Sequence, residues 1–106
     1  FWNSTYDEVQ FSDGTVDNAV TLKSGTGWAR PVIALDGNGH AHVFFGEYGS
    51  RNINYSTNAS GTWVNKVLSI EQSGEELAVG IDGSGRIHLI YMNYPEVELR
   101  HASLQL

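Results

Sequence analysis

The 106-residue chain has no cysteine, two prolines and no apolar run near the roughly 20 residues that a membrane-spanning helix needs. Without cysteine, disulfides, thiolate metal sites and cysteine nucleophiles are all excluded. No stretch keeps a 3.6-residue hydrophobic period, so amphipathic helices are not expected either. The chain is therefore predicted to fold without helices and without entering a membrane.

Basic residues are scarce. Six lysines and arginines stand against twelve acidic residues, which gives this acidic protein a net charge of −6. Nucleic-acid-binding proteins need clustered cations to displace counterions, and anionic membranes attract similar clusters. Neither nucleic acid nor a membrane surface is therefore expected as a partner, because the basic residues are scattered: Lys23, Arg30, Arg51, Lys66, Arg86 and Arg100.

An internal repeat recurs at a spacing of 46 residues. The segment Ile33–Thr57 aligns with Val79–Ser103 without a gap, and a partial third copy aligns Glu8–Ser12 with Asn52–Ser56 at a spacing of 44. Internal periods of this length are typical of propellers, solenoids and arrays. The matched turn and polar positions are Asp36, Gly37, Gly39, His42 and Tyr48 with Asp82, Gly83, Gly85, His88 and Tyr94.

Each repeat unit has the pattern of short β-strands joined by tight turns. The apolar runs 31–35 and 77–81 both end in Asp-Gly-x-Gly, a hairpin signal in which glycine supplies the positive φ that the turn requires. Asp36 and Asp82 are predicted to be structural turn residues rather than calcium ligands. The strand after each turn is apolar on both faces, as is typical of a strand that packs on two sides. The fold is therefore predicted to be all-β.

Four strands in about 45 residues is the pattern of a β-propeller blade. The stretch ALDGNGHAHVFFGEYGSRNINYSTNASGTWV (34–64) resembles the divergent blade repeats of bacterial β-propellers, lectin-like or sialidase-like, in which a D-x-x-G-x-x-H-h-x-Y pattern joins the first two strands. The resemblance implies about two four-stranded blades in each chain. These would be a partial blade over 1–29, a full blade over 30–70 and a partial blade over 71–106.

Two blades cannot close a ring, because known propellers have four or more. Two isolated blades would also expose apolar faces and unpaired strand edges. We therefore expect a homo-oligomer, with a trimer of six blades favoured, in which the strand near residues 16–24 completes the blade of a neighbour. Two alternatives stay open: a piece of a longer propeller, and an independent nine-strand β-sandwich or barrel.

Groups that could perform chemistry are few. His40 and His42 lie on one predicted strand face and could ligate zinc with a third ligand, but Arg86 replaces His40 in the second copy. The preferred interpretation is a histidine hydrogen-bonded inside the sheet, so neither a metal nor another cofactor is expected. The acidic residues fall mostly in predicted turns, and no triad or phosphate loop stands out. No catalytic residue is assigned, and a non-enzymatic protein is favoured.

Aromatic residues near predicted strand ends provide the remaining signal. Aromatic rings can stack on sugar faces, while neighbouring carboxylates and amides bond the hydroxyls. The pairs Glu47-Tyr48 and Asn93-Tyr94 repeat this combination, although packing between blades is the competing role for such rings. The candidate ligand-binding residues are Trp2, Trp28, Glu47, Tyr48, Trp63, Asn93 and Tyr94.

The predicted function is therefore a non-enzymatic, carbohydrate-binding module. Its location stays open, with the outside of the cell or its surface favoured. Weak sites repeated around a ring would gain avidity. The alternatives are a subunit or fragment of a propeller glycoside hydrolase, and a protein-interaction propeller with no small ligand.

Overall fold

The computed structural model describes residues 1–3, 8–12, 19–26, 29–47, 51–68, 73–93 and 98–105. Every regular element in these ranges is a β-strand, which confirms the all-β prediction. Over the same ranges there is no helix long and apolar enough to cross a membrane.

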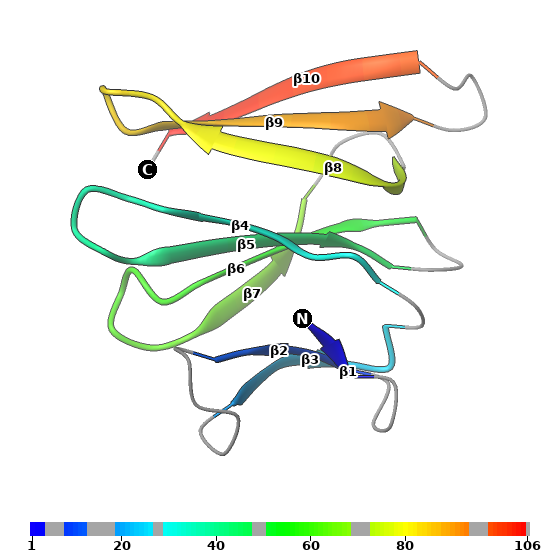
Figure 1. Cartoon of the computed structure of the whole chain (residues 1–106), viewed down its shortest axis with the longest axis horizontal. Helices are drawn as coiled ribbons and strands as arrows, with labels where there is room; N and C mark the ends of the chain where they lie inside the picture. The colour runs from blue at the N-terminus through cyan, green and yellow to red at the C-terminus, as the bar shows by residue number, and fades with distance from the viewer. Residues whose placement is uncertain are drawn as a thin grey trace.

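The strands form three antiparallel sheets that are stacked one above another (Figure 1). The N-terminal sheet has β1 (Trp2–Asn3), β2 (Glu8–Phe11) and β3 (Val20–Ser24). The middle sheet has β4 (Val32–Leu35), β5 (Ala41–Gly46), β6 (Ile53–Thr57) and β7 (Val64–Val67). The C-terminal sheet has β8 (Ser73–Ile81), β9 (Arg86–Asn93) and β10 (Glu98–Gln105).

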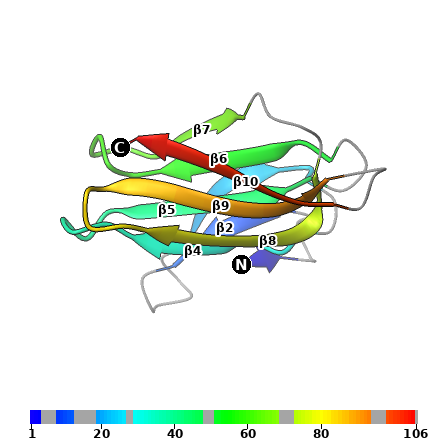
Figure 2. The same ribbon diagram turned by 90° about the horizontal axis from the view of Figure 1, so that it is seen from above.

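None of these sheets closes on itself within the described residues, so the barrel alternative was wrong. Strands that follow one another in sequence also lie side by side in each sheet, from β4 to β7 in the middle one. In the view from above, β4, β8 and the N-terminus lie toward one side of the stack and β7 toward the other (Figure 2).

The N-terminal sheet contains a strand that the sequence pattern did not predict. Phe1 and Gln10 exchange two backbone hydrogen bonds, each 2.7 Å long, and Trp2 and Asn3 continue this pairing as β1. On the other side of β2, the predicted fourth strand forms β3 and pairs within its own chain. This sheet therefore has three strands of its own, with β1 and β3 at its edges.

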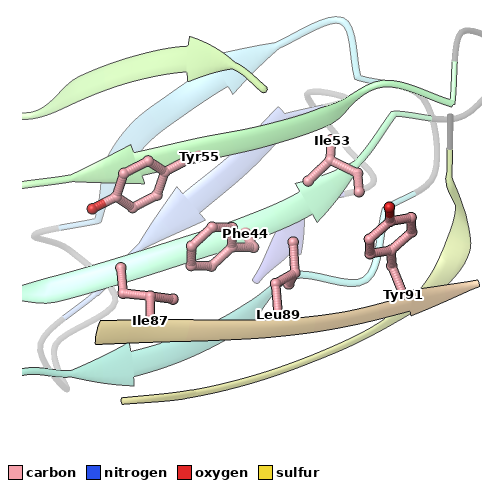
Figure 3. Packing of buried hydrophobic residues seen from close by; sticks show 6 residues of the cluster. All are labelled: Phe44, Ile53, Tyr55, Ile87, Leu89 and Tyr91. Atoms are coloured by element: carbon pink, nitrogen blue, oxygen red, sulfur yellow. The ribbon is translucent and has the colours of Figure 1, made fainter. Parts of the chain in front are cut away.

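One hydrophobic core lies between the middle and C-terminal sheets (Figure 3). Its ring pair is Phe44 and Tyr55, stacked with centroids 4.7 Å apart and planes 9° apart. Burying an aliphatic or phenyl side chain fully, as this core does for four of its members, stabilises a fold by about 1.5–3 kcal/mol each. The buried members are Phe44, Ile53 and Tyr55 from the middle sheet and Ile87, Leu89 and Tyr91 from β9.

A second core lies between the N-terminal and middle sheets. Val43 and Phe45 from β5 meet Val9 from β2, and Leu22 packs against the same cluster. Because strand side chains alternate, β5 sends Phe44 to one neighbouring sheet and Val43 and Phe45 to the other. All six residues of β5 are buried, as expected from its two apolar faces.

Candidate functional site

Asp36 organises the turn between β4 and β5. Its Oδ1 accepts hydrogen bonds from the backbone N–H groups of Asn38 (2.9 Å) and His40 (3.0 Å). Gly39 closes the same turn at a φ of 81°, a conformation that side chains with a Cβ rarely adopt. Its N–H donates to the Asp36 carbonyl over 3.0 Å. The other carboxylate oxygen of Asp36, Oδ2, lies 2.8 Å from His42 Nε2 on β5 and 3.7 Å from His40 Nδ1.

The second repeat reproduces this turn. Asp82 Oδ1 accepts from the backbone of Ser84 (2.9 Å) and Arg86 (3.0 Å), and Gly85 has a φ of 84°. Asp82 Oδ2 lies 2.9 Å from His88 Nε2. The aspartate and the histidine of the repeat are therefore bonded partners in both copies.

Each histidine also reaches the third strand of its sheet. His42 Nδ1 lies 2.7 Å from the Tyr55 hydroxyl, and His88 Nδ1 lies 3.0 Å from His101 Nε2. A carboxylate only accepts hydrogen bonds, so Nε2 of each histidine donates to its aspartate; in the neutral ring, Nδ1 then accepts from the third-strand group. We name these sets the middle network (Asp36, His42, Tyr55) and the C-terminal network (Asp82, His88, His101).

The sequence analysis did not identify the third member of either network. Tyr55 and His101 are 46 residues apart and so occupy the same position in the repeat. A sequence feature that could have identified them is the presence of a polar ring, tyrosine or histidine, at the same position of the third strand in both copies. Each network joins a hairpin turn, a second strand and a third strand of one sheet.

The two networks differ in burial. The side chain of His42 is 0% exposed and that of His88 is 38% exposed. His42 lies on the same face of β5 as Phe44, which the C-terminal sheet covers, whereas the matching face of the C-terminal sheet has no fourth sheet over it within the described chain. The middle network is therefore shielded from solvent, whereas the C-terminal network is accessible to solvent.

Hydrogen bonds lower the pKa of both aspartates. The bond to His42, together with the two turn N–H groups, lowers the pKa of Asp36 from 3.8 to about 2 against the opposing effect of desolvation. The bond to His88, then the Ser84 hydroxyl, lowers the pKa of Asp82 further. A glycosidase acid needs a raised pKa, so neither aspartate is suited to that role.

Burial raises the pKa of the Tyr55 hydroxyl, and the negative charge of Asp36 adds to the effect. The hydroxyl therefore stays protonated and can donate to His42. Both ring nitrogens of His42 are engaged by neighbours in its own sheet, which leaves no free lone pair for a metal. In the part of the chain that the structure describes, no group of three or more histidine and acidic side chains could hold a metal ion.

A polar cluster joins the N-terminal and middle sheets at the other end of the strands. The register shift opposite Val9 and Gln10 directs both Leu22 and Lys23 of β3 toward the middle sheet. Lys23 Nζ forms an ion pair with Glu47 and donates to Asn54 Oδ1 over 3.0 Å. Among the described residues, the Nδ2 atom of the fully buried Asn54 has no partner.

The predicted ligand-binding residues fall into separate groups. Trp2 and Trp63 pack against the core between the N-terminal and middle sheets, and the Trp63 ring lies 4.9 Å from that of Phe11 at 51°. Glu47 follows β5 and is 15% exposed beside Lys23. Asn93 ends β9, and its side chain is outside the description. Trp28, Tyr48 and Tyr94 lie outside the described residues.

The pKa of Asp36 predicts how the Asp36→Asn variant responds to acid. The stabilisation from an aspartate with a lowered pKa is present above about pH 4 and is lost as the pH falls toward 2. The variant should therefore be less stable than the wild type at pH 7, and the gap should close between about pH 4 and pH 2. Urea unfolding at each pH measures this gap.

The control for this series is Asn38→Ala, which keeps the carboxylate and the turn N–H. Its stability difference from the wild type should not change across the same pH range. A pH-independent gap for Asp36→Asn would show that the ionised carboxylate contributes nothing to stability through its bonds.

Compared with known proteins, the chain matches no family model, no curated protein and no solved structure. Its function is therefore inferred from its own residues and contacts.

Proposed function

We propose that the chain is a non-enzymatic binding module made of β-propeller blades, that identical subunits complete its ring, and that carbohydrate is its ligand. One observation carries the blade assignment: the middle sheet is covered on both faces by sheets that are stacked on it in the same orientation. Between them, the middle sheet and its neighbours bury two separate apolar clusters.

The orientation follows from matched residues. Val43 faces the preceding sheet, and its repeat partner Leu89 likewise faces the preceding sheet. Val9 aligns with Ile53 at the 44-residue spacing, and both face the following sheet. Each sheet thus uses one face for the sheet before it and the other for the sheet after it. Such head-to-tail contacts either close into a ring or continue without end.

The stack leaves apolar side chains uncovered at its ends. Leu99 on the outer face of the C-terminal sheet is 72% exposed. Exposed apolar surfaces on adjoining strands favour association. Identical subunits stacked end to end would cover this side chain.

Native mass spectrometry tests the assembly. We expect a discrete oligomer of the 11.6 kDa chain, with the trimer dominant. Leu99→Lys should shift the distribution toward smaller species, because a charge at the contact costs several kcal/mol when it is desolvated. A monodisperse monomer across micromolar concentrations would contradict the proposed ring.

Glu47, which directly follows β5, suggests the class of ligand. The Glu47 carboxylate is oriented by Lys23 and is directly followed by Tyr48 in the sequence. A fixed carboxylate and an aromatic residue that are neighbours in sequence suit a sugar, whose hydroxyls can donate to carboxylate oxygens and whose apolar face can stack on a ring. Repetition around a ring would raise a weak affinity through avidity.

A protein-interaction propeller with no small ligand is the second candidate. The packing of Trp2 and Trp63 between sheets favours it, because these rings then serve the core instead of a sugar platform. The hydrolase alternative would need its raised-pKa acid from elsewhere, since Asp36 and Asp82 have lowered pKa values.

A glycan array on the assembled protein tests the ligand class. We expect binding to a restricted set of glycans, and a loss of about tenfold or more for Glu47→Gln, the size of one lost charge-assisted hydrogen bond. Lys23→Gln keeps the carboxylate but removes the group that orients it, so a smaller loss is expected for this variant. Binding to no glycan, or equal losses in both variants, would contradict the carbohydrate proposal.

A further inference from the structure

Matched apolar positions of the repeat differ in exposure. Ile33 and Leu35 on β4 are 51% and 63% exposed, whereas their partners Val79 and Ile81 on β8 pack against the core between the middle and C-terminal sheets. β8 is covered because β4 and β5 lie against it. Among the described residues, no strand of the N-terminal sheet lies opposite Ile33 and Leu35 in the position that β4 occupies in the middle sheet.

The strand pairing identifies that position. At the 44-residue spacing, Phe1 aligns with Phe45 and Trp2 with Gly46, so β1 corresponds to the end of β5, the second strand of a unit. In the middle sheet, β5 pairs with β4 on the side away from β6. The corresponding place in the N-terminal sheet is beside β1, which is an edge strand.

A groove runs along this edge. It has a volume of about 190 Å³ and lies between the N-terminal and middle sheets, with mostly apolar walls. The view from above shows β4 and the N-terminus on the same side of the stack (Figure 2). The main lining residues are Phe1, Phe11, Pro31, Val32, Ile33 and Val43.

We propose that this groove binds an extended β-strand donated by a second polypeptide, which pairs with the edge of β1 and covers Ile33 and Leu35. An edge strand can pair through its outward backbone groups, and the adjacent pocket then selects alternate side chains of the donor. This site is separate from the proposed carbohydrate contacts at Glu47.

The chain itself indicates the chemistry of the donor. Where the same contact is made between the middle and C-terminal sheets, the covering strand is β4, which has four aliphatic residues and no charge. Val32 of this strand packs against the core beside β8. The donor strand is therefore short, uncharged and aliphatic, with small or β-branched side chains facing the groove.

Fluorescence polarisation tests strand donation with a labelled peptide of the β4 sequence, residues 29–38 (ARPVIALDGN). We expect saturable binding to the whole protein, weakened about tenfold or more in Ile33→Lys and Leu35→Lys, because a lysine ammonium would be desolvated against the strand. Both positions are exposed, so the variants should fold, and thermal unfolding verifies this.

Val64→Lys is the matched control, since Val64 is 51% exposed, as Ile33 is, but lies on β7 at the opposite edge of the middle sheet; this variant should bind the peptide as the wild type does. A peptide with aspartate in place of Val32 and Ala34 should not bind. Absence of binding at about 1 mM peptide, the limit of a specific contact, would overturn the proposal, as would equal binding by Ile33→Lys.

A third outcome is that Ile33→Lys abolishes self-association while the peptide binds neither the wild type nor any variant. The groove would then contact a folded face of a second copy, and strand donation would be overturned. No sugar is involved in this experiment. A failed glycan array would therefore leave the groove proposal standing, and a failed peptide titration would leave the carbohydrate proposal standing.

Discussion

The structure depends on one strand that is packed on both faces. β5 directs Phe44 into the core shared with the C-terminal sheet, and Val43 and Phe45 into the core shared with the N-terminal sheet. No residue of β5 has a solvent-facing side, since the whole strand is buried. The three small sheets are joined through this strand. Head-to-tail stacking follows, because each face of the middle sheet matches a different neighbour.

Packing on both faces constrains every polar residue on the central strands. His42, Asn54 and Ser56 are buried, and a buried polar group without a partner destabilises the fold by about 1–3 kcal/mol. Asp36 and Tyr55 satisfy the two ring nitrogens of His42. Asn65 donates to Ser56 over 2.6 Å, and the amide oxygen of Asn54 accepts from a lysine of the N-terminal sheet. The polar networks thus also fix which strands are neighbours, because each bond is possible in only one register.

Local features of the fold could be predicted from the sequence, and contacts between sheets could not. The repeated Asp-Gly-x-Gly turns and the two-faced apolar strand after each turn depend on neighbouring residues, so a pattern reveals them. The pairing of Lys23 with Glu47 depends on a register shift in β3 and on how two sheets stack, which no local pattern contains. Similarly, Ile33 and Val79 match in sequence but differ in burial, because burial is set by whether a strand of the neighbouring sheet lies opposite them. Trp2 and Trp63 were predicted to contact ligand, but they pack against the core between two sheets, and this placement too depends on how the sheets stack.

The most direct test of this account compares His42→Ala with His88→Ala by urea unfolding at pH 7. The two histidines make equivalent bonds to equivalent aspartates. They differ in burial, since a sheet covers His42 while His88 is 38% exposed, and in their third-strand partners, Tyr55 and His101. Loss of a buried, hydrogen-bonded side chain should lower the free energy of unfolding by about 2–4 kcal/mol for His42→Ala. Loss of the exposed copy should lower it by less than about 1 kcal/mol. Equal losses for the two variants would contradict the stacking of the C-terminal sheet on the middle sheet.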